Sequence, residues 1–315
     1  MKHDARGTIL VAPHHFPDLD REHALAQELG YHLVVADDVD AFRARLPEAE
    51  VAMMTPYARL TATDFSVMKK CRAVVRYGIG YDNIDVTAAT SAGIPVSIVP
   101  AATSEEVGSH AFAMGLALAR RLPAGDAAIR RHGWGGVIAY DTPVLSELEV
   151  GVVGMGRIGC HVARMYSAVG ARVRGYDPFL SESDIEMATL DDVLERSDIV
   201  SLHLPLAQDT RNLISTDVLR RMRTGALVVN VSRGGLIDES ALADALRSGH
   251  LGGAGIDTFA DEPLAHDHPL RTTPNTILTP HIAWRSNRST GALQEGAVER
   301  ARLALTGQPL IDTVN

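Results

Sequence analysis

The sequence contains little cysteine and lacks a long hydrophobic run. Two cysteines, Cys71 and Cys160, in 315 residues provide neither a disulfide framework nor a metal-ligand spacing, so we expect both to be reduced and no metal to be bound. The longest strongly apolar run, residues 111–119, is far shorter than the ~20 residues of a membrane helix, and the first four residues lead into no signal-peptide core. These absences predict a cytoplasmic protein that does not contact a membrane.

A concentrated basic region is also absent. The chain has 30 lysine and arginine residues against 39 acidic residues, a formal net charge of −9, and its arginines are scattered along the sequence. A nucleic-acid-binding surface needs clustered positive charge to displace counterions from phosphates, so we expect no nucleic acid partner. A small anionic substrate remains possible, because a few local arginines can dominate the potential of one site.

Apolar runs that alternate with helix-like segments occur in two series, and 315 residues is about twice the size of a typical domain of ~150 residues. Such alternation is typical of parallel sheets covered by helices on both faces. The fold class is therefore α/β, with two doubly wound parallel-sheet domains. The predicted strands are residues 8–11, 31–36, 51–54 and 72–76, then 150–153, 173–176, 199–202, 227–230, 255–258 and 276–278; helices are predicted at 20–29, 61–70 and 104–120, and an irregular loop at 130–146.

A glycine motif follows the first strand of the second series. Gly154-Met155-Gly156-Arg157-Ile158-Gly159 fits G-x-G-x-x-G, with a strand before it and a helix-like segment after it. Glycine lets the backbone approach a pyrophosphate, and the helix N-terminus supplies free N–H groups. Asp177 ends the next predicted strand, where it can accept ribose hydroxyls and repel a 2′-phosphate, so the predicted cofactor is NAD. Arg174, on the same strand, is interpreted as a solvated edge residue.

Three further segments place a charged or titratable side chain just after an apolar run. These side chains are Arg233, Glu262 and His281. Ligands of doubly wound sheets bind outside the strand ends, so the three could converge beside the nicotinamide. Taken singly, each also fits an ordinary role: a solvated loop arginine, a turn residue before proline and a histidine that only makes a structural hydrogen bond.

These motifs, in this order, resemble the D-isomer-specific 2-hydroxyacid dehydrogenase family over nearly the whole chain. The resemblance also includes residues 76–85 (RYGIGYDNID), 197–205 (SDIVSLHLP) with Thr210, and 252–257 (GGAGID). It implies a Rossmann cofactor domain, residues 103–284, inserted into a flavodoxin-like substrate domain, residues 1–102 plus 285–315. It further implies an active site in the cleft and a homodimer.

The resemblance also implies roles for individual residues. Arg233 would hold the substrate carboxylate bidentately, His281 would exchange a proton with the substrate oxygen, and Glu262 would orient the imidazole and favour its charged form. The implied substrate-binding residues are Arg76, Tyr77, Gly78, Ile79, Arg233 and Trp284, where Arg76 either faces a second anionic group or is a surface residue. The implied cofactor-binding residues are Gly154, Met155, Gly156, Arg157, Ile158, Asp177, His203, Pro205, Thr210, Val231, Ser232 and Asp257.

The chain departs from the family pattern at some positions. Ile98 stands where many members have asparagine, and Gly108-Ser109 replaces a commoner pair of a small and an acidic residue. Trp284 resembles the glycerate and hydroxypyruvate group, and the C-terminal binding corepressors, more than the phosphoglycerate group. The expected function is NAD-dependent hydride transfer between nicotinamide and a small D-2-hydroxy or 2-keto acid. Two alternatives remain open: oxidation of phosphite or a phosphonate analogue, and an NAD-sensing, corepressor-like binding protein.

Overall fold

A computed structural model describes residues 6–137, 142–180 and 183–315. The chain divides into two compact units. Unit 1 combines Met1–Thr103 with Arg285–Asn315, and unit 2 is the intervening stretch, Ser104–Trp284. The last part of the chain therefore completes the unit that the first part begins.

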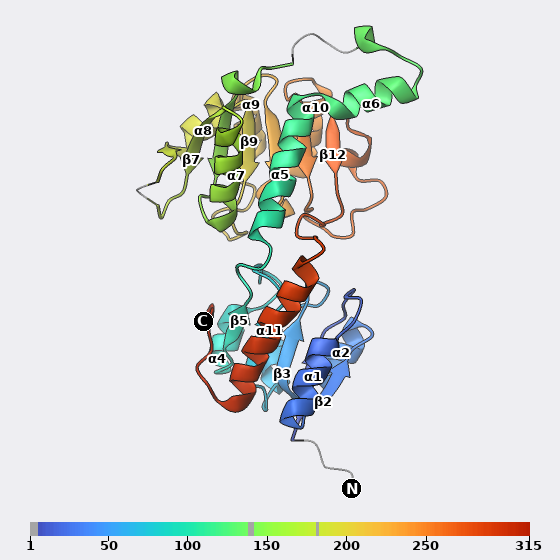
Figure 1. Ribbon diagram of the computed structural model, residues 1–315, viewed down its shortest axis with the longest axis vertical. Helices are drawn as coiled ribbons and strands as arrows, with labels where there is room; N and C mark the ends of the chain where they lie inside the picture. Colours follow the sequence, from blue (N-terminus) through green and yellow to red (C-terminus); the bar gives the residue numbers. More distant parts are fainter. Residues whose placement is uncertain (1–5, 138–141, 181–182) are drawn as a thin grey trace. The chain divides into compact units, whose positions relative to one another are not determined.

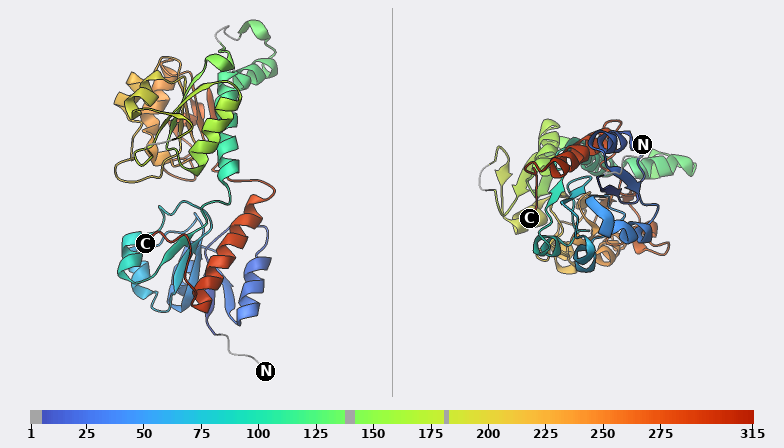
Figure 2. Two further views of the ribbon diagram at one scale, coloured as in Figure 1. Left: turned by 60° about the vertical axis from the view of Figure 1, so that its left-hand side comes forward. Right: turned by 90° about the horizontal axis from the view of Figure 1, so that it is seen from below.

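Unit 1 contains a five-stranded, all-parallel sheet with the order β2-β1-β3-β4-β5, which is the flavodoxin-like order. Helix α11 lies beside α1 and against β3 and β4 (Figures 1 and 2). The strands are β1 (Thr8–Val11), β2 (His32–Val35), β3 (Ala49–Met54), β4 (Ala73–Arg76) and β5 (Val96–Ile98), and the helices are α1 (Asp20–Leu29), α2 (Val39–Arg45), α3 (Ala62–Val67), α4 (Val86–Ser91) and α11 (Ser289–Thr306).

Short polar side chains define where the helices of unit 1 begin. Asp38 and Asp85 each accept a backbone N–H of the first turn of α2 and α4. Thr61 and Asp64 form a reciprocal capping box at α3. Helix α3 ends at Val67, three residues before the predicted end. Every residue of β4 and β5 is buried, as expected for a sheet covered on both faces.

Unit 2 contains a seven-stranded, all-parallel sheet with the order β12-β11-β10-β9-β6-β7-β8. Strand order reverses between β6 and β9, as in a Rossmann sheet, so the predicted fold class is confirmed. The strands are β6 (Glu149–Val153), β7 (Arg172–Tyr176), β8 (Glu186–Met187), β9 (Ile199–Leu202), β10 (Leu227–Asn230), β11 (Gly253–Ile256) and β12 (Thr276–Leu278), and the helices are α5 (Ser104–Ala119), α6 (Leu122–Arg130), α7 (Arg157–Ala168), α8 (Leu190–Arg196), α9 (Thr216–Arg221) and α10 (Glu239–Arg247).

The structure of unit 2 differs in detail from the prediction. Strand β11 begins two residues before the predicted strand, at Gly253. A Cβ at Gly255 would lie 2.9 Å from the Met114 Cβ, so these glycines let α5 lie directly on the sheet. The sequence analysis also missed α6, whose first turn contains a proline. None of the described helices is long and apolar enough to cross a membrane.

Candidate active site

The glycine loop joins β6 to α7 at the point where the strand order of unit 2 reverses. Gly154 has a φ of +95°, which L side chains rarely adopt. A Cβ at Gly159 would lie 1.9 Å from the Gly154 carbonyl oxygen, whereas a Cβ at Gly156 would meet no atom within 4 Å. Open space therefore faces the start of α7, where Gly156 provides no side-chain cap for the first N–H groups. This cradle fits a dinucleotide pyrophosphate.

Asp177 lies against the glycine loop. Its Oδ2 accepts a hydrogen bond from the Met155 N–H at 2.9 Å, and its Oδ1 accepts one from the Phe179 N–H at 2.9 Å. A carboxylate has about four acceptor positions, so capacity remains for ribose hydroxyls. The interpretation of Arg174 as a solvated residue was wrong: its guanidinium pairs with Glu149 at 2.8 Å and Glu186 at 3.1 Å.

The ends of β9 and β10 carry the next group of predicted cofactor-binding residues. The Ser232 hydroxyl donates to the Leu202 carbonyl at 2.7 Å, which ties the two strand ends together, and Val231 is buried. The His203 Nε2 lies 2.8 Å from the Ser201 hydroxyl, and burial lowers the pKa of His203 to about 3. His203 is therefore neutral at physiological pH, and its own backbone packs against Gly154.

The loop after His203 is closed by a threonine. The Thr210 hydroxyl donates to the Pro205 carbonyl and accepts the Ala207 N–H, both at 2.8 Å. Thr210 and Pro205 therefore form one turn at the end of β9, on the same edge of the sheet as the glycine loop.

Arg233, Glu262 and His281 come together at this edge of unit 2. The His281 Nδ1 lies 2.8 Å from the Glu262 Oε2, and the Phe259 N–H donates to the other carboxylate oxygen at 3.0 Å. Burial alone would raise the pKa of Glu262, but the hydrogen bond and charge of His281, the Phe259 N–H and the charge of Arg233 together lower it. An ionised Glu262 accepts the Nδ1 proton, so the Nε2 of His281 is the nitrogen available to a ligand.

The backbone of His281 has a φ of +53°, and Asp257 holds it there. The His281 N–H donates to the Asp257 carbonyl at 2.8 Å. The buried Asp257 carboxylate accepts the N–H groups of Ile282 and Ala283, both at 2.9 Å, and the Thr279 hydroxyl at 2.5 Å. These contacts fix the loop that carries the histidine and offset the strain of its backbone. The Asp257 carboxylate thus supports the His281 loop, in addition to any contact with a cofactor.

Trp284 closes the same loop from its C-terminal side. The indole N–H donates to the His281 carbonyl at 3.1 Å, and the ring is half-buried. The structure therefore assigns Trp284 a contact with the histidine loop that the sequence did not predict.

The predicted substrate-binding loop of unit 1, residues 76–79, follows β4. Arg76 is 7% exposed and its guanidinium donates to the Tyr77 carbonyl, so the alternative of a surface arginine was wrong. The Tyr77 side chain is buried, and the N–H groups of Tyr77 and Gly78 donate to backbone carbonyls. In the part of the chain that the structure describes, the Ile79 N–H has no protein acceptor, and Ile79 is exposed. Ile79 therefore offers the loop's available amide donor.

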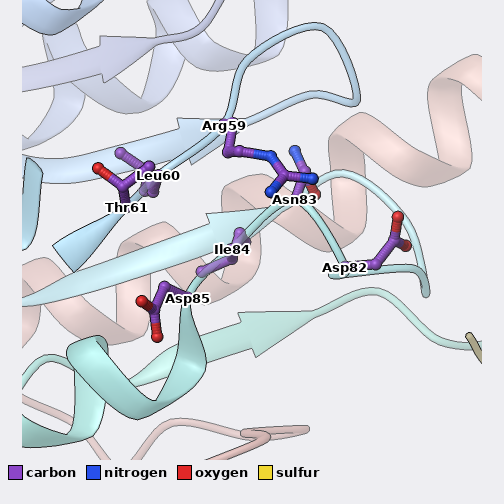
Figure 3. A pocket seen from close by; sticks show the side chains of 7 residues that line it. All are labelled: Arg59, Leu60, Thr61, Asp82, Asn83, Ile84 and Asp85. Atoms are coloured by element: carbon purple, nitrogen blue, oxygen red, sulfur yellow. The ribbon is translucent and has the colours of Figure 1, made fainter. Parts of the chain in front are cut away.

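Unit 1 also contains a cavity of about 270 Å³ (Figure 3). It lies between the segment that precedes α3 and the segment that precedes α4. Among the described residues, no group of three histidine, cysteine or acidic side chains is arranged to bind a metal ion. The cavity is lined by Arg59, Leu60, Thr61, Asp82, Asn83, Ile84 and Asp85.

The sequence analysis missed residues that hydrogen-bond to the predicted site residues or support them through a neighbour. Thr279 and His110, whose Nε2 lies 3.1 Å from the Thr279 hydroxyl, support Asp257. Asn230 ends β10, and its amide donates to the Arg233 carbonyl at 2.8 Å. Thr279 and Asn230 lie at predicted strand ends, so a search for polar residues there would have found them. His110 has no such signal, because it is one residue in a helix that is apolar on nearly every face.

Comparison with known proteins agrees with this geometry. Residues 112–283 match the family model described as "D-isomer specific 2-hydroxyacid dehydrogenase, NAD binding domain". A D-3-phosphoglycerate dehydrogenase of Mycobacterium tuberculosis is 38% identical over 297 residues, 93% of this chain and 56% of the relative. The chain thus spans little more than half the length of that relative. A glyoxylate reductase of Korarchaeum cryptofilum is 38% identical over 262 residues, 80% of this chain and 78% of the relative.

A solved structure with the same fold contains ligands. The D-lactate dehydrogenase from Aquifex aeolicus, in complex with NAD and lactic acid, superposes with a TM-score of 0.87 at 28% identity and covers 95% of this chain and 96% of its own. The likeness extends over both units of the chain.

Proposed function

The chain belongs to the D-isomer specific 2-hydroxyacid dehydrogenase family, and from this premise we propose that it transfers a hydride between NAD and a small D-2-hydroxy acid or 2-keto acid. Glycerate, hydroxypyruvate and phosphoglycerate-like acids are the proposed substrates. The observation that carries the proposal is the 2.8 Å contact between His281 Nδ1 and Glu262, with the charge of Arg233 acting on the same carboxylate.

His281 is the proposed acid and base. Glu262 accepts the Nδ1 proton, so protonated His281 has a second N–H, at Nε2, to give to a substrate carbonyl oxygen. The neutral imidazole takes the proton back when the hydroxy acid is oxidised. A positioned group of this kind contributes about 100- to 10,000-fold to the rate.

Arg233 is the proposed ligand of the substrate carboxylate. Its planar guanidinium can make two parallel hydrogen bonds to a carboxylate, which fixes the face of the neighbouring carbonyl group. The loop at residues 76–79 is the proposed second contact, through the Ile79 N–H. On this proposal unit 1 is the substrate domain, and Trp284 limits the space around the substrate.

The glycine loop, Asp177 and the strand-end loops at His203 and Ser232 are proposed to bind NAD. The bound nicotinamide would supply or accept the hydride. The residues of this chain have the separate tasks of holding the dinucleotide, orienting the carboxylate and moving the proton. The Asp177 carboxylate beside the Met155 N–H supports NAD over its 2′-phosphorylated form, because it would repel a second negative charge.

A homodimer, formed in the cytoplasm, is also proposed. On α6, Leu122 and Ile129 lie seven residues apart and therefore on one face, and they are 61% and 56% exposed. Trp134, after this helix, is 80% exposed. Monomers rarely expose apolar side chains in such a group, which supports contact with a second copy. Light scattering of the whole chain should give twice the mass of 33.8 kDa.

A panel of acids tests the proposed reaction. Hydroxypyruvate, glyoxylate, phosphohydroxypyruvate and a phosphonate analogue would each be mixed with NADH, and the loss of nicotinamide absorbance followed. Phosphite with NAD provides the oxidative comparison. Turnover of at least one 2-keto acid is expected, whereas turnover of phosphite alone, or NADH binding without any turnover, would contradict the proposal.

A further inference from the structure

We propose that Glu22 and Gln294 are positioning residues for the loop at residues 76–79, and that they act through the hydroxyl of Tyr77. This inference rests on the proposed function, in which that loop contacts the substrate carboxylate. Neither Glu22 nor Gln294 lies in the loop, and they come from the first and last helices of unit 1.

A buried hydrogen-bond network joins three elements of unit 1. The Tyr77 hydroxyl donates to Glu22 Oε1 at 2.9 Å. The Gln294 amide donates to Glu22 Oε2 at 3.2 Å and to the Asp18 carbonyl at 2.9 Å. Glu22 is 0% exposed and Gln294 is 2% exposed. The carboxylate on α1 therefore links the end of β4 to α11.

The Tyr77 ring is held on two sides. Its centroid lies 4.9 Å from that of Phe16 in an edge-on contact, and its hydroxyl is held by Glu22. The Tyr77 N–H donates to the Met54 carbonyl, and the Val99 N–H donates to the Gly78 carbonyl at 3.1 Å. The side chain thus acts as an anchor directly before the turn that exposes Ile79. A shift of the ring would move the Ile79 N–H with it.

Burying a carboxylate and a phenol hydroxyl costs free energy that a purely structural contact could avoid. Burial raises the pKa of the Glu22 carboxyl, although the hydrogen bonds from Tyr77 and Gln294 oppose that rise. Burial and the neighbouring Glu22 also raise the pKa of Tyr77. Apolar side chains of similar volume often stabilise a core as well as a buried polar group does. Hydrogen bonds are directional, so the bond from the Tyr77 hydroxyl fixes the orientation of the ring, which apolar packing alone would fix less tightly.

Tyr77→Phe and Glu22→Gln test the positioning role. Tyr77→Phe keeps the ring and removes the hydroxyl, and Glu22→Gln keeps an acceptor for Tyr77 but places an amide donor opposite Gln294. Tyr77→Phe should raise the KM of the keto acid about three- to tenfold with little change in kcat and in the Kd of NADH, since it displaces a substrate contact. Glu22→Gln should raise it less, because the bond to Tyr77 can still form.

Asp64→Asn is the matched control. Asp64 is also a buried carboxylate of unit 1, and it accepts the Thr61 N–H and hydroxyl at the start of α3. Its loss should lower Tm without changing the KM. Amide hydrogen exchange of residues 76–80 gives a second readout, and Tyr77→Phe should speed it about fivefold or more while Asp64→Asn leaves it unchanged.

The outcomes distinguish a failure of the positioning role from a failure of the proposed function. A lower Tm in Tyr77→Phe with normal KM and normal exchange of residues 76–80 would overturn the positioning role and leave a structural one. If Glu22→Gln does not fold, Gln294→Leu takes its place, with the same direction of change expected. If the wild type reduces no 2-keto acid, the proposed function fails, and hydrogen exchange alone decides whether the network holds the loop.

Discussion

Replacing Glu262 by glutamine should shift the fall in the rate of reduction to lower pH while the arrangement of the active-site side chains is kept. Reduction requires protonated His281, so its rate falls as pH rises and the imidazolium loses its proton. The Glu262 carboxylate, 2.8 Å from Nδ1, stabilises the positive charge. The pKa of Glu262 is lowered, mainly because the hydrogen bond and charge of His281 outweigh burial, so this carboxylate is ionised at neutral pH. Glutamine keeps an acceptor but removes the charge.

The size of the effect follows from the geometry. A hydrogen bond to a charged group contributes about 1.5 to 3 kcal/mol when well formed. The two side chains are 33% and 36% exposed, so solvent screening reduces this contribution by about half. The remaining ~0.8 to 1.5 kcal/mol corresponds to about half a pH unit to one pH unit. The rate of reduction in Glu262→Gln should therefore fall at a pH about half a unit to one unit lower than in the wild type.

Rates in both directions would be measured at saturating cofactor across the pH range. At neutral pH, reduction should fall more than oxidation, because oxidation uses the neutral imidazole. Asp261→Asn is the control, since Asp261 is an exposed acid next to Glu262 in the same loop. If the pH at which reduction falls is unchanged in Glu262→Gln, or shifts equally in Asp261→Asn, the coupling between Glu262 and His281 is refuted.

Three other substitutions test separate parts of the site. Asp257→Asn places an amide donor opposite N–H and hydroxyl donors, so the free energy of unfolding, measured by thermal unfolding, should fall by about 2–4 kcal/mol. The kcat should fall as well, and an unchanged kcat would refute the proposal that Asp257 supports His281. Asp177→Ala should reduce the preference for NADH over NADPH by about tenfold, the value of one charge-assisted hydrogen bond, and a wild type that prefers NADPH would contradict the assignment. Gly159→Ala sets a Cβ 1.9 Å from the Gly154 carbonyl, so calorimetry should show weaker NADH binding and lower stability; normal affinity would mean that the glycine loop does not bind the cofactor.

Much of the fold was predictable because buried parallel strands read as continuous apolar runs. β9 and β10 begin and end at the predicted residues. β11 was displaced in the prediction because its glycines carry no strand signal, and their role appears only when α5 packs against them. α6 was missed for a similar reason. Its proline and glycine are typical of a loop, and its larger apolar side chains, Leu122 and Ile129, remain exposed.

The site was predictable to the extent that its residues lie at strand ends. Arg233, Glu262 and His281 each follow an apolar run, and the doubly wound topology gathers such positions at one edge of the sheet. Their supporting residues follow no such rule. Glu22 is a buried carboxylate on an otherwise ordinary polar helix, and its partner Gln294 is 272 positions away. Only the packing of α11 against α1 brings the two together.

The most direct test of the proposed chemistry compares the wild type with His281→Ala. For each protein, kcat for reduction of the best keto acid and the Kd of NADH would be measured under the same conditions. The proton donor acts on the substrate and not on the dinucleotide, so kcat should fall by about 100- to 10,000-fold while the Kd of NADH changes little. Near-normal turnover in His281→Ala would contradict the assignment of His281 as the acid and base.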